Sequence, residues 1–140
     1  MSFSIDITGI PAKAINQITD QLPARAASAA LILRNASLEV LSGQRGGRRY
    51  KKPGGGYYTA SAPGEPPAVR TGRLRGSWRP IQCGANGQNP AIETTVFYAR
   101  YMENGTPGGM IAPRPFVQKI VEKAKPGVEG IYAQPFHLSF

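Results

Sequence analysis

ARAASAALILRNASLEVLSG, residues 24–43, is the most strongly helical segment of this chain. Alanine and leucine favour helix, and small or apolar residues recur at spacings of three and four, which places them on one face. The members of that face are Ala26, Ala30, Leu33, Ala36 or Ser37, Val40 and Leu41. Because alanine has a small side chain, the face permits close approach of another helix or a sheet. Gly43 is suited to end the helix.

Two further elements are expected before residue 24. Apolar and polar residues alternate over residues 2–8, which predicts a short, half-buried strand. Pro11 suits the first turn of a following helix. Pro23 lacks a backbone N–H, so we expect either a kink there or a new helix that begins near Leu22.

A β-hairpin is expected in the second half of the chain. WRPIQC (78–83) and AIETTVFYA (91–99) are rich in β-branched and aromatic residues, and the Asn-Gly pair between them favours a turn. A short helix is expected to follow the hairpin and to end at Asn104 and Gly105.

RPFVQKIVEKAKPG (114–127) predicts a terminal helix. The Pro126-Gly127 pair is expected to stop it, because proline cannot continue a regular helix. Its apolar face is formed by Phe116, Ile120 and Ala124, widened by Val117 and Val121. In the apolar tail that follows, a late strand is expected at Phe136, Leu138 and Phe140.

Residues 43–69 contain no apolar periodicity and are rich in glycine, proline and arginine. They are expected to form one loop longer than the usual limit of about 12–15 residues, and such a loop is either functional or disordered. The sequence therefore predicts a single α+β domain over residues 1–140. A kinked N-terminal helix and a C-terminal helix pack on a small antiparallel β-sheet, with a long central loop at 43–69 and a tail at 127–140.

Positive charge is concentrated in one part of the chain. The net charge is +9, and residues 43–80 hold nine basic residues against one acid. The basic residues are Arg45, Arg48, Arg49, Lys51, Lys52, Arg70, Arg73, Arg75 and Arg79. Because nearly the whole surplus lies in this segment, the distribution indicates a negatively charged partner.

Residues suited to catalysis are scarce. The chain has one histidine, His137, expected at the surface or in packing, and one cysteine, Cys83, expected to be a buried thiol. The acidic residues are spread singly, without a pair suited to acid–base work. No phosphate-binding loop, nucleophile elbow or dinucleotide fingerprint is present. We therefore expect no catalytic residue, no metal site, no cofactor and no membrane-spanning segment.

QRGGRRYKK (44–52) indicates binding instead of catalysis. It mixes arginine, lysine, glycine and tyrosine, as flexible nucleic-acid-binding segments do. The residues expected to face DNA are Arg45, Arg48, Arg49, Lys51 and Lys52. The alternative is a solvated loop that only keeps the protein soluble. No folded module for base-specific recognition is apparent.

SAPGEPPAVRTGRLRGSW (61–78) is a second candidate for binding. Its prolines stiffen the backbone, so the segment loses little entropy when it docks on another surface. Its arginines can donate to carboxylates or phosphates, and two large apolar side chains can act as anchors. These residues are Pro63, Pro66, Pro67, Arg70, Arg73, Leu74, Arg75 and Trp78. The combination predicts an arm at a subunit interface; the alternative is an ordinary turn that leads into a core tryptophan.

Three motifs occur in one order within residues 57–125. They are SAPGEPP-x3-TG-x-L-x2-S, Y-A-x-Y-x-E-x-G-T and A-x-RPF. Together they resemble the head–tail joining, or neck, family of long-tailed bacteriophages. The chain departs from the family pattern in an Arg/Gly insertion at 43–56 and in the apolar tail after Pro126.

The resemblance implies a non-enzymatic virion protein that forms a ring of six or twelve copies. Such a ring joins the head connector to the tail, lines or seals the DNA channel, and is assembled in the cytoplasm of the bacterial host. Its neighbours would be head-closure or adaptor proteins and tail-terminator or tail-tube proteins, and its basic block would meet packaged DNA or an acidic rim. Tyr98, Tyr101 and Phe116 join the 61–78 segment as expected interface residues. The alternatives are a tail-terminator or tail-completion ring protein and a basic nucleic-acid-binding protein without sequence specificity.

Overall fold

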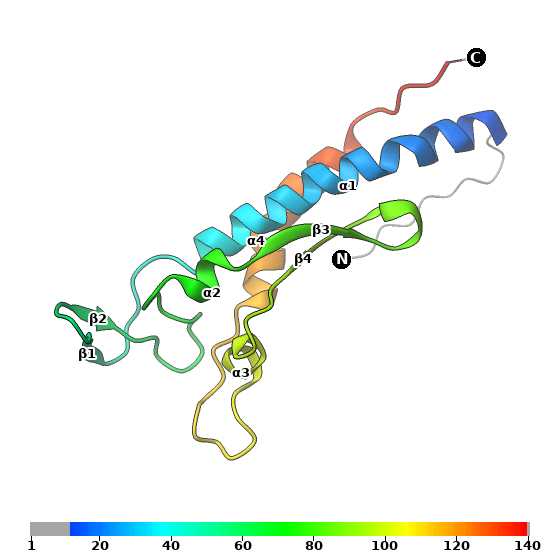
Figure 1. Ribbon diagram of the computed structural model, residues 1–140. Helices are drawn as coiled ribbons and strands as arrows, with labels where there is room; N and C mark the ends of the chain where they lie inside the picture. The colour runs from blue at the N-terminus through cyan, green and yellow to red at the C-terminus, as the bar shows by residue number, and fades with distance from the viewer. Residues whose placement is uncertain (1–11, 140) are drawn as a thin grey trace.

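The computed structural model describes residues 12–139 (Figure 1). In chain order, its elements are α1 (Ala12–Val40), β1 (Arg49–Lys51), β2 (Tyr57–Thr59), α2 (Arg73–Gly76), β3 (Arg79–Cys83), a short 3₁₀ turn (Ala85–Gly87), β4 (Asn89–Glu93), α3 (Ala99–Asn104) and α4 (Val117–Ala133). The α+β class is confirmed. The strand predicted at residues 2–8 lies outside the described residues.

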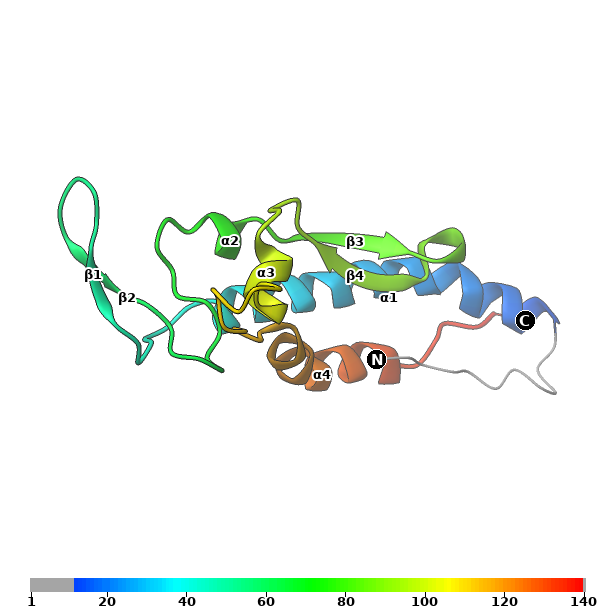
Figure 2. The ribbon, with the colours of Figure 1, turned by 90° about the horizontal axis from the view of Figure 1, so that it is seen from below.

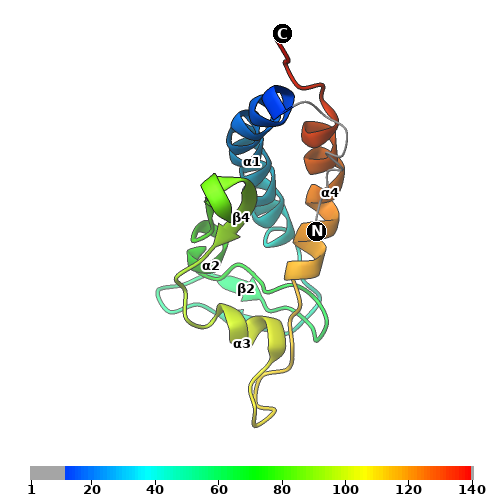
Figure 3. The same ribbon diagram turned by 90° about the vertical axis from the view of Figure 1, so that its right-hand side faces the viewer.

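Helix α1 lies in the middle of the molecule, with α4 along one side and the β3–β4 hairpin along another (Figures 2 and 3). Ala26 and Ala30, predicted to permit close approach, are at most 1% exposed. The other predicted members of this face also pack inward: Ala36, Ser37 and Leu41 are buried, and Leu33 and Val40 are half-buried against the core. The predicted buried face is therefore confirmed.

Helix α1 continues through Pro23 as one element of 29 residues, so of the two alternatives expected there, a kink or a new helix near Leu22, the new helix is wrong. Proline removes one backbone hydrogen bond but leaves its carbonyl free to accept others. The Pro23 carbonyl accepts a hydrogen bond from Nε2 of Gln82 on β3, 2.6 Å away. Small residues on both sides of the proline, Ala14 and Ala26, are buried. Packing along the whole helix thus outweighs the local cost of the proline.

Helix α4 also passes through its expected stop at Pro126-Gly127 and ends at Ala133. Ile120, Ala124 and Val128 recur every four residues and are all buried, so the apolar face continues beyond the proline. Gly127 lies against α1: a Cβ atom added there would stand 3.1 Å from Cγ2 of Ile32. The glycine therefore allows close helix packing and does not end the helix.

The tail after α4 forms no strand within residues 134–139, so the strand expected at Phe136 and Leu138 is wrong, and Phe140 lies outside the described residues. Instead, backbone N–H and carbonyl groups of the tail form hydrogen bonds with two glutamine side chains of α1. Gln17 exchanges two 2.7 Å hydrogen bonds with the backbone of Ser139. Gln21 donates to the carbonyl of His137 over 2.6 Å and accepts from its N–H over 2.9 Å.

Arg25 of α1 holds the C-terminal end of α4. Its guanidinium donates at 2.6–3.3 Å to the carbonyls of Ile131, Tyr132, Gln134 and Pro135. It also lies 3.7 Å from the centre of the Phe136 ring. A cation at this position donates to carbonyls at and just beyond the end of the helix and complements the helix dipole.

The two hairpins differ in how well the sequence indicates them. The predicted hairpin forms as β3 and β4, with Arg79 opposite Glu93 and Cys83 opposite Asn89. Its second strand ends at Glu93, so the strand expected over residues 94–99 is wrong, and Ala99 already belongs to α3. Residues 43–69 were expected to be one loop, but they also contain an antiparallel hairpin, β1–β2. Apolar periodicity could not reveal it, because its strands are mostly exposed and bury no complete face.

Gly105 ends α3 as expected and has a φ of +76°. A Cβ atom there would stand 2.8 Å from the Ile111 carbonyl oxygen and 3.0 Å from Cδ of Pro113. Gly105→Val is therefore expected to lower the free energy of unfolding by about 2 kcal/mol, as measured by urea denaturation. Gly108→Ala is the control, because φ there is ordinary and a Cβ meets nothing within 4 Å. Equal effects of the two substitutions would contradict this role of Gly105.

Candidate interaction surface

The three motifs that occur in one order in the sequence contact one another in the fold. Glu103 of α3 accepts hydrogen bonds from the N–H groups of Phe116 and Val117, at 2.8 and 3.2 Å, and so caps the N-terminus of α4. The N–H of Arg114 donates to the carbonyl of Met102 over 2.6 Å. A carboxylate at this end of a helix also complements the helix dipole. The second and third motifs therefore form one structural unit.

Residues 61–67, which we call the prolyl elbow, are fastened to the rest of the chain. The Glu65 carboxylate accepts hydrogen bonds from the N–H groups of Gly46 and Ala62, at 3.0 and 2.8 Å. These two backbone hydrogen bonds lower the pKa of Glu65 below its usual value, since they favour the ionised form. The N–H of Gly64 donates to the Pro113 carbonyl over 3.3 Å.

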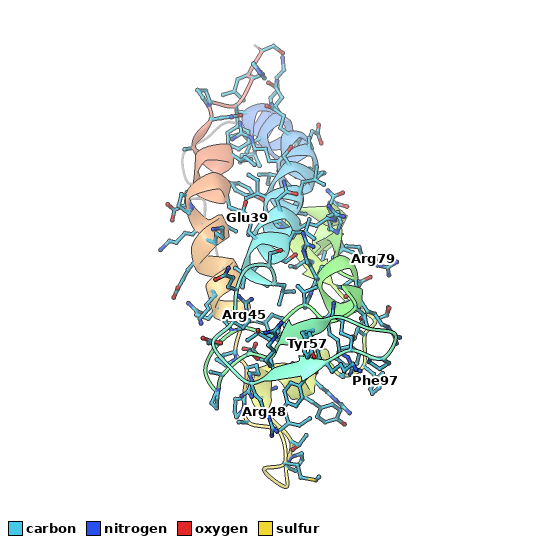
Figure 4. The ribbon with its side chains drawn as sticks, turned by 90° about the vertical axis from the view of Figure 1, so that its left-hand side faces the viewer. Glu39, Arg45, Arg48, Tyr57, Arg79 and Phe97 are labelled. Carbon is cyan, nitrogen blue, oxygen red and sulfur yellow. The ribbon has the colours of Figure 1, made fainter. Side chains whose placement is uncertain are left out.

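Arg45 lies between the end of α1 and the elbow (Figure 4). Its guanidinium donates to five backbone carbonyls at 2.8–3.3 Å, those of Val40, Ser42, Gln44, Pro66 and Pro67. The side chain thus closes the C-terminal end of α1 and ties the elbow to it. Arg45 is therefore not a free DNA-facing residue, because its donors are engaged within its own chain.

The elbow and the residues after it do not extend away from the body. Pro67 is buried, Pro66 is half-buried, and Pro63 is exposed. Trp78 meets Phe116 edge-on, with ring centroids 5.9 Å apart, and both pack in the core. This arrangement matches the alternative of a turn that leads into a core tryptophan. Phe116 is 1% exposed in the single chain, so it supports the fold and is not available to a neighbour.

The second half of the 61–78 segment borders an open cleft of about 470 Å³. Buried or half-buried apolar side chains line it, namely Leu41, Leu74 and Met102. Exposed arginines and one half-buried tyrosine line it as well: Arg70, Arg73, Arg75 and Tyr98. Tyr101 is not among the lining residues; its hydroxyl accepts a hydrogen bond from Arg100. The structure therefore brings together several predicted interface residues around one concave surface.

Hairpin β1–β2 projects from the same end of the molecule (Figures 1 and 2). Arg48, Arg49 and Lys51 are exposed, as predicted for residues that face a partner, and Lys52 is half-buried. Tyr57, 56% exposed, lies under the guanidinium of Arg49, with 4.4 Å between its ring centroid and Cζ. The expected basic block is therefore divided: part lies on this hairpin, part lines the cleft, Arg45 binds its own backbone, and Arg79 pairs with Glu93 on the other hairpin.

Sequence patterns missed a group of exposed apolar residues at this end. Phe97 is 71% exposed and Met110 is 92% exposed, and Ile111 beside it is also exposed. Figure 4 shows Phe97 on the same end of the molecule as Arg48 and Tyr57. The signal in the sequence was the stretch PGGMIAP, in which two large apolar residues stand in a loop of glycine and proline. Such a loop lies at the surface and cannot bury an apolar pair by itself.

Three acidic side chains among the described residues form ion pairs. Glu39, Glu93 and Glu129 pair with Lys123, Arg79 and Lys125. Within residues 12–139, no group of three or more His, Cys, Asp or Glu residues is placed to hold a metal ion. Cys83 is exposed on β3, so the expectation of a buried thiol is wrong. None of the helices described is both long and apolar enough to span a membrane.

Comparison of the chain with protein-family models, with curated proteins and with solved structures finds no match.

Proposed function

We propose that this chain is a non-enzymatic structural protein of the phage neck. Copies assemble into a ring that joins the head connector to the tail around the DNA channel. The proposal rests on the three motifs of the sequence and, above all, on the exposed apolar residues at one end of the molecule. Phe97 and Met110 are the most exposed of the large apolar side chains described, and apolar surface that gathers in one place commonly marks an interaction site.

The position of these residues supports contact between copies. Phe97 precedes α3, Met110 and Ile111 lie in the loop after it, and the arginine-lined cleft borders the same helix through Tyr98 and Met102. A protruding apolar loop and a concave surface on one chain are the two halves of a head-to-tail contact. Repeated around an axis, such a contact closes into a ring where the rotation between neighbouring copies divides a full turn evenly.

The placement of acidic residues supports a structural role. Glu65 and Glu103 bind backbone N–H groups, and other acids form surface ion pairs. Such groups hold segments in place, whereas acid–base catalysis needs a carboxyl directed at a substrate.

The proposal is tested by native mass spectrometry of the purified chain, alone and mixed with the products of the adjacent genes. The expected result is an assembly of six or twelve copies. Phe97→Asp combined with Met110→Asp should reduce it to monomers, because the new charges would have to be buried at the contact.

Leu31→Asp is the matched control. Leu31 is also exposed, but it lies on α1 away from the loop after α3, so assembly should persist. A chain that stays monomeric with every neighbour, or a double variant that assembles normally, would contradict the proposal. Binding to the tail tube alone, without the head connector, would favour the tail-terminator alternative.

A further inference from the structure

We propose that the β1–β2 hairpin is a DNA-binding ribbon that enters the major groove of duplex DNA and contacts the phosphates on both sides. The inference deepens the proposed function and rests on it for the source of the DNA. The observation that carries it is a projecting two-stranded hairpin with cations on both faces.

The distribution of charge on the hairpin follows from strand alternation. Arg49 and Lys51 share one face with Tyr57, because Lys51 pairs with Tyr57 across the strands. Tyr50 and Tyr58 stack on the opposite face, with ring centroids 5.6 Å apart, and the Arg48 guanidinium lies 5.4 Å from the Tyr50 ring. A flat acidic protein surface could meet one face only. A groove bounded by two phosphate backbones meets both.

These cations lack acidic partners within the described residues. The ion pairs formed there are on α1, α4 and the other hairpin, at Lys123–Glu39, Lys125–Glu129 and Arg79–Glu93. The only acid between residues 43 and 80, Glu65, is engaged with backbone N–H groups of the elbow. The charge of the hairpin therefore remains available for an external anion.

The backbone of the hairpin is held in a fixed shape. Three residue pairs form its ladder, and further hydrogen bonds close both ends: Gly47 N–H to the Ala60 carbonyl over 2.9 Å, and Lys52 N–H to the Gly56 carbonyl over 2.8 Å. A Cβ at Gly47 would collide with the Ala60 carbonyl at 2.4 Å, so this close approach requires glycine. A ribbon formed in advance loses little conformational entropy on binding.

The dimensions of the ribbon suit one groove of the duplex. Paired strands lie about 5 Å apart, and side chains widen the ribbon further. The major groove, about 12 Å wide, admits a two-stranded ribbon as it stands, whereas the minor groove, about 6 Å wide, would first have to be widened by deforming the duplex. Residues 54–56 at the tip are all glycine, and a Cβ at any of them would meet nothing within 4 Å. The tip is therefore thin enough to lead the ribbon into the groove.

Binding is measured by fluorescence anisotropy with a labelled 20-base-pair duplex over a range of salt concentrations. Changing Arg48, Arg49 and Lys51 together to serine should weaken binding at least about tenfold at 0.1 M salt. It should also reduce the slope of log K against log salt by about three, close to one for each lost phosphate contact.

The matched control changes Lys13, Lys123 and Lys125 to serine. It removes the same charge from α1 and α4 but leaves the hairpin intact, so it should bind nearly as the parent does. Equal losses in both triple variants would overturn the proposal, because general attraction by net charge would then explain the binding. Parent-like binding by the hairpin variant would overturn it as well.

Two further measurements test which groove of the duplex is bound and which class of anion is preferred. A duplex whose cytosines carry glucosylated hydroxymethyl groups, which fill the major groove, should bind more weakly, whereas netropsin in the minor groove should have no effect. The reverse pattern, or tighter binding to single-stranded DNA or to polyglutamate, would overturn the proposal. Native mass spectrometry of the same samples distinguishes failure of the proposed ring from failure of the DNA-binding ribbon. A monomer whose DNA binding depends on the hairpin refutes the ring and supports the ribbon.

Discussion

Phe116→Ala is expected to lower the free energy of unfolding by about 3–5 kcal/mol, which is enough to unfold much of a marginally stable domain. Phe116 is 1% exposed and is in the core cluster with Leu41 and Ile120. It also meets Trp78 edge-on, so the substitution leaves a cavity bordered by α1, α4 and the start of β3. Urea denaturation followed by tryptophan fluorescence measures the change, because the only tryptophan is beside the altered site.

Val117→Ala is the control for this prediction. Val117 is adjacent in sequence but 44% exposed, so its loss should change stability by less than about 0.5 kcal/mol. Similar losses in the two variants would show that Phe116 contributes no more than an exposed residue. It would then have to be considered again as a contact with a neighbouring subunit.

Arg45→Met is expected to cost about 2–3 kcal/mol and to release the prolyl elbow. Methionine preserves much of the volume but donates no hydrogen bond, so the carbonyls of Val40, Pro66 and Pro67 lose a charged donor in a partly buried site. Urea denaturation measures the stability, and limited proteolysis with trypsin reports the release, as faster cleavage after Arg70, the first tryptic site beyond the elbow.

Arg48→Met is the matched control, since Arg48 is three residues away and exposed on the projecting hairpin. It should leave stability and proteolysis unchanged and should weaken DNA binding. Arg45→Met should weaken DNA binding only through loss of the folded chain. If both variants were equally stable, the five carbonyl contacts of Arg45 would have no energetic importance.

The main elements could be predicted because burial leaves a periodic pattern. The alanine face of α1 is the clearest example, whereas β3 and β4 bury no residue fully and were indicated mainly by the Asn-Gly turn between them. Two prolines were given too much weight: Pro23 and Pro126 each remove one hydrogen bond, but the apolar faces on both sides of them remain buried. The exposed strands β1 and β2 carry no such pattern, so they could not be recognised.

The candidate surface was harder to predict than the fold. Arg45 and Arg48 belong to one basic run, and composition cannot tell which of them binds its own backbone. Arg25 and Glu103 close the two ends of α4 from distant parts of the chain, over separations of up to 110 residues. These contacts depend on tertiary geometry. By contrast, the exposure of Arg49 and Lys51 followed directly from a run of charge without apolar periodicity.

The Glu65 carboxylate makes the two ends of the molecule respond differently to acid. Its pKa is lowered in the folded chain, so its contribution to stability is complete above the usual carboxyl range and disappears as the pH falls through the lowered value. At the opposite end, Gln17, Gln21 and Arg25 hold the tail with groups that do not titrate in that range. Acidification therefore weakens the attachment of the elbow at Gly46 and Ala62, while the hydrogen bonds from Arg45 to Pro66 and Pro67 and those of the C-terminal tail persist.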